Sequence, residues 1–233
     1  PDFKEEKKLW KRGYKTVVGI DEVGRGPLAG PVVAAAFCFR FKHSKMRFGL
    51  QFLNINDSKK LSAKQREKIY KVLKRNPDSR WGIGKVSEKV IDKINIFQAT
   101  KLAMQKAVRN LEKKLEEKTE NGLVLKSHDR GKLAPVNLVD FLIIDGNFGI
   151  RIRKNPSGYI PYKSIIKADQ KVFSVAAASV MAKVTRDRMM INYHKKYPDY
   201  GFDKHKGYGT ELHRNLIHKY GFCKIHRKSF KIS

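Results

Sequence analysis

The alternation of apolar and polar positions divides this chain into segments of two periods, one typical of strands and one typical of helices. Five segments are short and rich in β-branched or aromatic residues, which is the pattern of strands. They comprise residues 16–21, 31–41, 81–86, 138–144 and 164–167. The first two are separated only by the sequence GRGPLAGP, so we expect them to form an adjacent, hairpin-like pair.

Helices are predicted where apolar residues recur every three or four positions. Ser62 and Gln65 form a capping box that starts a helix ending near Arg75. A longer helix is predicted over about residues 90–118, a third from Asp169 onwards, and a fourth over about 210–220. Because residues 176–179 are Ala-Ala-Ala-Ser, we expect the third helix to pack closely against the sheet.

The order of these segments predicts an α/β fold with a mixed sheet. The sequence strand, strand, helix, strand, helix, strand, strand, helix does not alternate as an all-parallel sheet requires. We expect five strands flanked by helices in residues 1–199, and a small C-terminal helical cap in residues 200–233. Residues 112–135 are polar and dense in charge, so we predict a surface insertion there.

The composition indicates a soluble globular protein with a polyanionic partner. Hydrophobic residues make up 41% of the 233, enough for a core, and no apolar run approaches the roughly 18 residues of a membrane-spanning helix. The 51 Lys and Arg against 22 Asp and Glu give a net charge of +29, which favours nucleic acid. The alternatives are charge spread over solvated faces and, as a minor one, an anionic membrane surface.

The cysteines and the first residues indicate where the protein works. Cys38 and Cys223 are too few for a disulfide framework, and Cys38 lies in an apolar run where it is expected to be a small core residue. The first ten residues are highly charged and do not resemble a secretion signal. We therefore expect a reducing compartment, the cytoplasm.

Four carboxylates lie where predicted strands end or a predicted helix starts: Asp21, Glu22, Asp145 and Asp169. Side chains at such positions can meet at one edge of a sheet. Clustered anions repel one another unless cations neutralise them, and Mg²⁺ or Mn²⁺ prefer oxygen ligands of this kind. The alternative for any single acid is that it only caps a turn.

The adjacent pair Asp21 and Glu22 needs a special backbone. Neighbouring residues of a regular strand point to opposite faces, so both acids can serve one site only if the strand ends there. The sequence VGRGP at residues 23–27 is expected to supply that turn.

A fifth acid, Asp187, competes with Asp169 for the last position in the site. It lies 18 residues after Asp169, which is roughly 27 Å along a continuous helix, so the two cannot share a metal. Asp187 is flanked by two arginines, and we expect it to form a structural ion pair instead.

Residues 19–32, GIDEVGRGPLAGPV, resemble the signature of ribonuclease HII of the bacterial type. Further matching segments follow in the same order along nearly the whole chain: DSKKLS at 57–62, INI at 94–96, IDG at 144–146, KAD at 167–169, AAAS at 176–179, AKV at 182–184 and HKGYGT at 205–210. The first fifteen residues, residues 112–135 and the last dozen lie outside this resemblance.

The resemblance implies a ribonuclease H-like fold and a site in which the four acids bind two divalent ions, Mg²⁺ or Mn²⁺. It implies that Gly24, Arg25 and Gly26 contact the 2′-hydroxyl of a ribonucleotide, and that Tyr208 stacks under the adjacent deoxyribose. These roles are physically reasonable, because glycines let backbone amides approach closely and the 2′-hydroxyl distinguishes RNA from DNA. The sister family, ribonuclease HIII, usually has lysine where this chain has Arg25.

The resemblance also implies substrate contacts at Ser58, Lys59 and Asn95. Ser58 and Lys59 precede a predicted helix start, where amides favour phosphate. The alternative for them is an exposed lysine pair, and for Asn95 an ordinary residue of the cap region.

The activity implied by the resemblance is hydrolysis of the phosphodiester 5′ to ribonucleotides in RNA/DNA hybrids and in duplex DNA with embedded ribonucleotides. Two metal ions would take part, leaving 5′-phosphate and 3′-hydroxyl ends. A monomer with a role in DNA repair is expected. The alternatives are another nuclease of the same fold, such as a junction resolvase, and a non-catalytic basic protein that binds nucleic acid.

Histidines are concentrated near the C-terminus, at His205, His213, His218 and His226, with Cys223 among them. Their spacing fits no usual zinc pattern. We expect them to contribute, with neighbouring Lys and Arg, to a basic face for nucleic acid.

Overall fold

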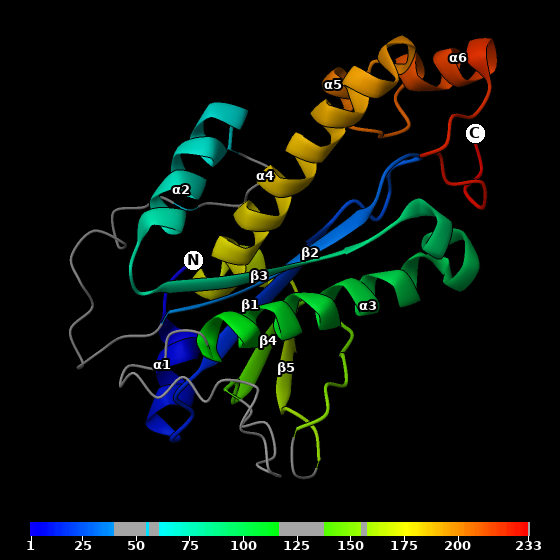
Figure 1. Cartoon of the computed structure of the whole chain (residues 1–233). Helices are drawn as coiled ribbons and strands as arrows, with labels where there is room; N and C mark the ends of the chain where they lie inside the picture. The colour runs from blue at the N-terminus through cyan, green and yellow to red at the C-terminus, as the bar shows by residue number, and fades with distance from the viewer. Residues whose placement is uncertain (40–54, 56–60, 117–137, 155–157, 233) are drawn as a thin grey trace, which may run out of the picture.

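Five strands form one mixed sheet in the order β3-β2-β1-β4-β5 (Figure 1). The computed structural model describes residues 1–39, 55, 61–116, 138–154 and 158–232. The strands are β1 (Val17–Val23), β2 (Val32–Phe39), β3 (Ser79–Val86), β4 (Phe141–Asp145) and β5 (Tyr162–Ile165). β2 is antiparallel to β1 and β3, whereas β4 is parallel to β1 and to β5. The predicted mixed sheet and its hairpin-like first pair are confirmed.

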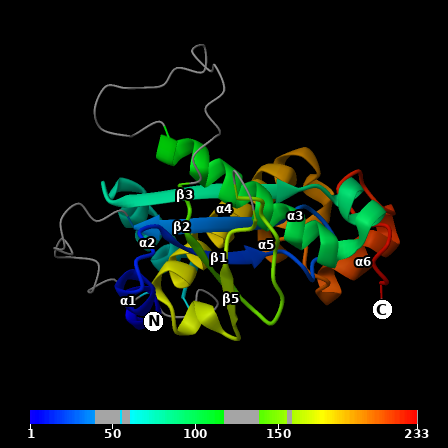
Figure 2. The same ribbon diagram turned by 90° about the horizontal axis from the view of Figure 1, so that it is seen from below.

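The helices cover both faces of the sheet and extend beyond one end of it. They are α1 (Lys4–Lys11), α2 (Ala63–Arg75), α3 (Glu88–Glu116), α4 (Phe173–Lys196), α5 (Phe202–His205) and α6 (Glu211–Tyr220), with 3-10 turns η2 (Ala168–Gln170) and η3 (Pro198–Tyr200). Figure 1 shows α3 on one face and α4 with α2 on the other. Seen from below, α6 and the C-terminus lie at the end of the molecule opposite α1 (Figure 2). None of the helices in these ranges is long and apolar enough to cross a membrane.

Several predicted boundaries differ from those of the structure. Helix α4 does not begin at Asp169: that residue lies in η2, after Lys167 takes a left-handed conformation with φ 57°, and α4 starts four residues later. Residues 112–116 of the predicted insertion continue α3, and Leu115 is buried in the core. The remainder of that insertion lies outside the described residues.

Helix α1 was not predicted, because six of its eight residues are charged on a segment with few apolar positions. Its apolar side is nevertheless buried, with Leu9 in the core and Phe3 just before it packed on Phe173. The buried carboxylate of Glu6 accepts a hydrogen bond of 2.9 Å from the backbone N–H of Ser174. Helix α1 therefore caps the amino end of α4, where an acceptor is favourable.

Helix α4 lies directly on β1, as its small residues predicted. A Cβ at Gly19 would lie 2.3 Å from the backbone carbon of Ser174, so only glycine permits this approach. Residues 176–178 of the helix are buried alanines. This contact fixes α4 relative to the strand that carries Asp21 and Glu22.

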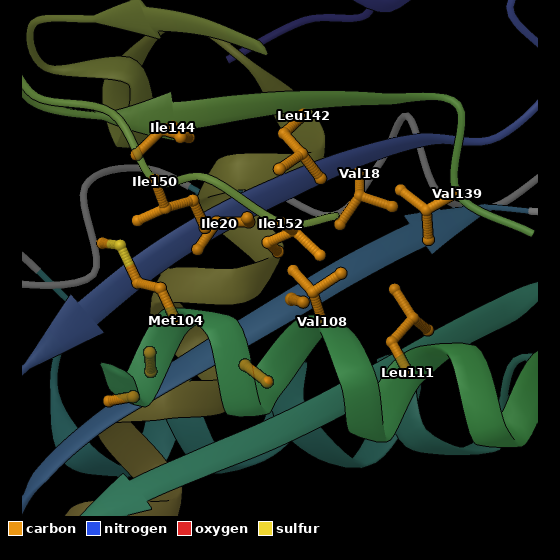
Figure 3. Close-up of a cluster of buried hydrophobic side chains, with 14 of the residues drawn as sticks. Val18, Ile20, Met104, Val108, Leu111, Val139, Leu142, Ile144, Ile150 and Ile152 are labelled. Atoms are coloured by element: carbon orange, nitrogen blue, oxygen red, sulfur yellow. The ribbon is translucent and has the colours of Figure 1, made fainter. Parts of the chain in front are cut away.

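The core on the α3 side fixes β1 beside β4. Figure 3 shows Val18 and Ile20 of β1 next to Leu142 and Ile144 of β4, facing the side chains of α3. All four are fully buried, and Cys38 belongs to the same cluster, as predicted. The register pairs Ile20 with Ile144. Asp21 and Asp145, each one residue further along its strand, therefore lie beside each other on neighbouring parallel strands.

Candidate active site

Three carboxylates meet near the carboxyl ends of the neighbouring parallel strands β1, β4 and β5. Asp21 lies on β1 and Asp145 ends the neighbouring strand β4. β5 pairs with β4 on its other side, and the turn η2 that follows it carries Asp169. One oxygen from each acid lies within 4.8 Å of the others. The structure thus brings together three of the four acids that the sequence singled out, and we call Asp21, Asp145 and Asp169 the acid group.

Hydrogen bonds hold two of these carboxylates in place. Asp21 is buried and accepts from the backbone N–H of Glu22 at 2.7 Å and from the side chain of Ser179 on α4. Asp145 accepts from the backbone N–H of Ala168 at 2.6 Å. Burial, followed by the charges of Glu22 and Asp145, raises the pKa of Asp21 well above its usual value. The site is therefore electrostatically costly without a cation.

Glu22 is not one of the three acids within 4.8 Å of one another, and the expected end of the strand at Asp21 and Glu22 is wrong. β1 continues to Val23, and Glu22 pairs with Ala34 in regular register. Alternation therefore places Glu22 on the α3 side, whereas Asp21 lies on the α4 side. Its Oε1 accepts from Arg25 at 3.3 Å, while its buried Oε2 has no partner among the described residues. Burial raises the pKa of Glu22, although Arg25 opposes this effect.

The residues present fit a hard divalent cation. Three carboxylates within 4.8 Å offer the oxygen ligands that such cations prefer. The buried Oε2 of Glu22 is a further acceptor, close enough to Asp145 for their charges to interact. No other group of three metal-binding side chains is found in the described ranges.

The loop after β1 contains the three residues that the resemblance assigns to the ribonucleotide. Gly24 is buried with φ +90°, and a Cβ there would meet the side chain of Arg186 at 2.3 Å, so the fold requires glycine. Arg25 and Gly26 are exposed. A Cβ at Gly26 would meet no atom within 4 Å, so nothing in the surrounding protein requires glycine at that position.

Tyr208 lies in a loop held against the same region. Its ring is 38% exposed, with Nζ of Lys183 at 5.8 Å and Cζ of Arg186 at 5.7 Å from its centroid. Lys183 follows Ser179 by one turn of α4, so Tyr208 lies near the acid group on the same helix face. The preceding residue, Gly207, accepts a hydrogen bond from Leu28 of the loop after β1.

The other predicted contacts have different outcomes. Asn95 caps the kinked part of α3, since its Oδ1 accepts from the N–H of Gln98 at 3.1 Å. Its φ of 63° and ψ of 165° belong to a region that side chains rarely adopt, which is common at functional sites. Ser58 and Lys59 lie outside the described residues, so their roles stay predictions.

Asp187 forms structural ion pairs, as predicted. Its partners, however, are Lys183 at 2.8 Å and Arg66 at 3.9 Å, and not the arginines beside it in the sequence.

The prediction that the C-terminal histidines contribute to a basic face is wrong for three of the four. His205, His213 and His226 are buried and contact one another, with His213 Nε2 at 3.1 Å from His226 Nε2. Burial lowers the pKa of His205, and it lowers those of His213 and His226 to about 4. His213 and His226 are therefore neutral at pH 7, and of these four histidines only His218 is exposed.

Two arginines near the site were missed by the sequence analysis. Arg186 is fully buried and donates to the carbonyls of Pro31, Lys206 and Ala29. Arg227 is buried in the same way and donates to the loop after β1. In a chain with 51 Lys and Arg, no local pattern marks these two as special.

The family model for ribonuclease HII matches residues 18–127 and 145–233. The chain belongs to the ribonuclease HII family. Relatives named ribonuclease HII include that of Syntrophus aciditrophicus, 43% identical over 97% of this chain and 89% of its own length, and that of Chlamydia caviae, 44% identical over 97% and 88%. The chain is accordingly an endonuclease of the type 2 ribonuclease H class, a hydrolase.

Solved structures agree with this assignment and confirm the ribonuclease H-like fold. The ribonuclease H2 of Pyrococcus horikoshii OT3 has a TM-score of 0.65 and 25% identity over 93% of this chain and 94% of its own. The fold is shared with Bst-RNase HIII, solved in complex with Mn²⁺, with a TM-score of 0.63 and 16% identity over 94% of this chain and 68% of that one.

Proposed function

We propose that this ribonuclease HII-type enzyme hydrolyses the phosphodiester 5′ to a ribonucleotide, in RNA/DNA hybrids and in duplex DNA with embedded ribonucleotides, leaving 5′-phosphate and 3′-hydroxyl ends. The observation that carries the proposal is that the three carboxylates lie next to a loop in which Arg25 and Gly26 are exposed. Asp21 of the acid group and Gly24 to Gly26 of the loop are separated by only two residues of one strand. Catalysis and recognition of the ribose would then act on neighbouring atoms of one nucleotide.

Asp21, Glu22, Asp145 and Asp169 would hold the metal ions in this proposal. Two divalent ions, Mg²⁺ or Mn²⁺, would supply activation of the attacking water and stabilisation of the leaving 3′ oxygen. The protein contributes the fixed placement of the carboxylates. Ser179 and the backbone N–H of Ala168 bind Asp21 and Asp145 and so limit their rotation.

Recognition of the ribose is assigned to Gly24, Arg25 and Gly26. Gly26 supports this assignment because it is exposed and no neighbouring atom explains its missing side chain. A glycine that the fold does not need is accounted for by a ligand that must approach the backbone closely. The group contacted there would be the 2′-hydroxyl, which deoxyribose lacks.

Tyr208 is proposed to stack against the deoxyribose next to the ribonucleotide. Its partly exposed ring offers an apolar face, and Lys183 and Arg186 lie near it. Together with the net charge of +29, these cations favour a duplex backbone as the partner. We propose that the enzyme acts as a monomer, which size-exclusion chromatography with light scattering would test.

The decisive experiment is cleavage of matched DNA duplexes that contain zero, one or four ribonucleotides, in Mg²⁺ and in Mn²⁺. We expect cleavage of the second and third duplexes only, on the 5′ side of a ribonucleotide, so that each new 5′-phosphate end is carried by a ribonucleotide. Asp21→Asn and Asp169→Asn should abolish it, whereas Asp199→Asn, which changes an exposed acid outside the group of three carboxylates, should not. Cleavage of an all-DNA branched substrate would favour a junction resolvase instead. Absence of cleavage with any divalent ion would favour a non-catalytic binding protein.

A further inference from the structure

Arg227, near the C-terminus, binds the backbone of the loop after β1. Its side chain is only 1% exposed. Nη2 donates to the carbonyl of Gly24 at 2.5 Å, Nη1 to that of Arg25 at 2.8 Å, and Nε to that of Gly30 at 2.9 Å. One planar guanidinium thus binds both ends of the loop.

The segment around Arg227 is itself fixed to the loop and to α3. The backbone N–H of Arg227 donates to Leu28 at 2.8 Å. Just after it, the carboxylate of Asp92 on α3 accepts from the backbone N–H groups of Lys228 and Ser229, each at 3.0 Å. The ring of Phe230 covers the guanidinium, with Cζ 4.9 Å from the ring centroid. The arginine is therefore held in one orientation from several sides.

The energetics of Arg227 are unusual for a purely structural side chain. No carboxylate lies within 4 Å of it in the part of the chain that the structure describes. Asp92 and Glu88 act on it only at longer range. Burial of a charge without an ionic partner is costly, and apolar packing often stabilises a core equally well. A requirement for this particular hydrogen-bond pattern accounts for the arginine.

That pattern determines the direction of two amide groups. The carbonyl of Gly24 shares a planar trans peptide with the N–H of Arg25, and the carbonyl of Arg25 shares one with the N–H of Gly26. Since C=O and N–H point in opposite directions across such a peptide, binding both carbonyls from the inside points both N–H groups away from Arg227. Neither N–H has an acceptor among the described residues, and both residues are exposed.

We propose that Arg227 is a positioning residue for ribose recognition: by binding the carbonyls of Gly24 and Arg25, it presents the N–H groups of Arg25 and Gly26 to the 2′-hydroxyl of the substrate. This inference rests on the proposed function, because it assumes that the loop contacts the ribose. It assigns a role to a residue that lies 202 positions from Arg25 in the sequence. Arg227 itself does not touch the substrate.

The test measures preference for a ribonucleotide separately from general affinity for DNA. Binding of two duplexes, one all-DNA and one with a single ribonucleotide, is followed by fluorescence anisotropy. Ca²⁺ replaces Mg²⁺, since it also prefers oxygen ligands, and a denaturing gel verifies that the duplex stays intact. The variants are Arg227→Met, Arg227→Lys and a control, Lys224→Met, which removes one exposed charge from the same segment.

The wild type is expected to prefer the ribonucleotide duplex by about 10-fold, the worth of one or two well-placed hydrogen bonds. Arg227→Met should reduce this preference to within about 2-fold, and Arg227→Lys should be intermediate because an ammonium lacks the planar fork. Affinity for all-DNA duplex should change no more than in Lys224→Met. A folded Arg227→Met protein that retains the wild-type preference would overturn the inference. If the wild type itself shows no preference for the ribonucleotide duplex in binding or in cleavage, the proposed function is wrong, and the role of Arg227 is wrong with it.

Arg227→Met leaves three carbonyls without a donor and could prevent folding, so two further variants loosen the arginine without removing it. Phe230→Ala uncovers the guanidinium, and Asp92→Ala frees the backbone of Lys228 and Ser229. Each should lower the ribonucleotide preference about 3-fold or more at unchanged affinity for all-DNA duplex. An unchanged preference in both of these variants would also overturn the inference.

Discussion

Gly24 and Gly26, two residues apart in the loop after β1, are glycines for different reasons. Gly24 has a positive φ and lies against Arg186, so the fold of the protein requires it. Gly26 has open space where a Cβ would lie and does not have a positive φ. The fold therefore explains the glycine at position 24 but not the one at position 26.

The first prediction concerns this pair. Gly26→Ala should fold with a melting temperature close to that of the wild type, because the added methyl group meets nothing, yet cleave a single-ribonucleotide duplex at least about 10-fold more slowly. Gly24→Ala should be destabilised by about 1–3 kcal/mol through backbone strain and the clash with Arg186. Thermal melts and initial cleavage rates check both effects. Full activity of a folded Gly26→Ala protein would remove the support that Gly26 gives to ribose recognition.

The second prediction concerns repulsion among the acids. Asp145→Asn should abolish cleavage, yet in EDTA its melting temperature should equal or exceed that of the wild type, because one of three anions within 4.8 Å is removed. The amide oxygen introduced by this substitution can still accept from Ala168. Mg²⁺ should raise the melting temperature of the wild type by binding the folded state, and this rise should be lost in the variant.

The matched control for Asp145→Asn is Asp199→Asn, which removes an exposed acid outside the group. It should keep both the cleavage activity and the stabilisation by Mg²⁺. An Asp145→Asn protein that Mg²⁺ stabilises as strongly as the wild type would contradict the assignment of Asp145 as a ligand.

At this scale the sequence alone predicted that Asp21, Asp145 and Asp169 lie together, but not the backbone at Glu22. Carboxylates that follow apolar runs are visible in one dimension, and Asp21, Asp145 and Asp169 were found that way. The direction of Glu22 was not, because it depends on whether β1 ends at Asp21 or continues to Val23. Register with β2 decides that point, and register is a property of two segments together.

At the scale of elements, helices with a clear apolar period were predicted from the sequence, whereas a helix that depends on its packing against another element was not. Helix α2 has the predicted capping box at Ser62 and Gln65, and α6 begins after Thr210 as expected. Helix α1 is marginal by itself and is stable through its packing on α4, so its sequence carries little sign of it. The kink at Asn95 breaks no periodicity and was likewise not predicted.

The elements α5 and α6 and the C-terminal segment meet around the three buried histidines. The N–H of Cys223 donates to His226 Nδ1, so His226 carries its proton on Nε2 and donates it to His213. His213 in turn donates from Nδ1 to the carbonyl of Tyr208. Adding a proton to either ring would break one of these bonds, which agrees with their lowered pKa values.

The third prediction is a loss of stability in mild acid. The pKa of His213 and His226 is about 4 in the folded protein and about 6.5 in the unfolded chain. Above pH 6.5 both states are neutral. Between pH 6.5 and 4 only the unfolded state binds the protons, so the free energy of unfolding should fall with decreasing pH by up to about 1.4 kcal/mol per pH unit for each histidine.

Urea unfolding at pH values from 7.5 to 4.5 measures the slope of the free energy of unfolding against pH. Carboxylates also titrate in the range, so the comparison with variants isolates the histidines. His226→Gln should be less stable at pH 7.5 but show a shallower slope, whereas His218→Gln, an exposed site, should leave the slope unchanged. An unaltered slope in His226→Gln would show that the cluster does not cause the pH dependence.

At the scale of the whole molecule, the N-terminal and C-terminal segments lie at opposite ends of the protein. The N-terminus and α1 lie at one end, and α6 with the C-terminal segment lies at the other (Figures 1 and 2). The C-terminal segment returns to the loop after β1, where His226 and Ala29 form an isolated β-bridge. Such a contact between distant parts of the chain leaves no local pattern, which is why the contacts of Arg227 were not predicted from the sequence.

The fourth prediction uses the net charge of +29. Charge attracts the phosphates of any duplex, and the release of counterions makes this part of binding weaken linearly with the logarithm of salt concentration. The proposed recognition of the 2′-hydroxyl by the uncharged amides of Arg25 and Gly26 would release no counterions. From 50 to 200 mM KCl, the affinities for all-DNA and single-ribonucleotide duplexes should therefore fall along parallel lines. Fluorescence anisotropy measures both slopes, and a preference that disappears as salt rises would mean that the side chain of Arg25, and not the backbone, recognises the ribonucleotide.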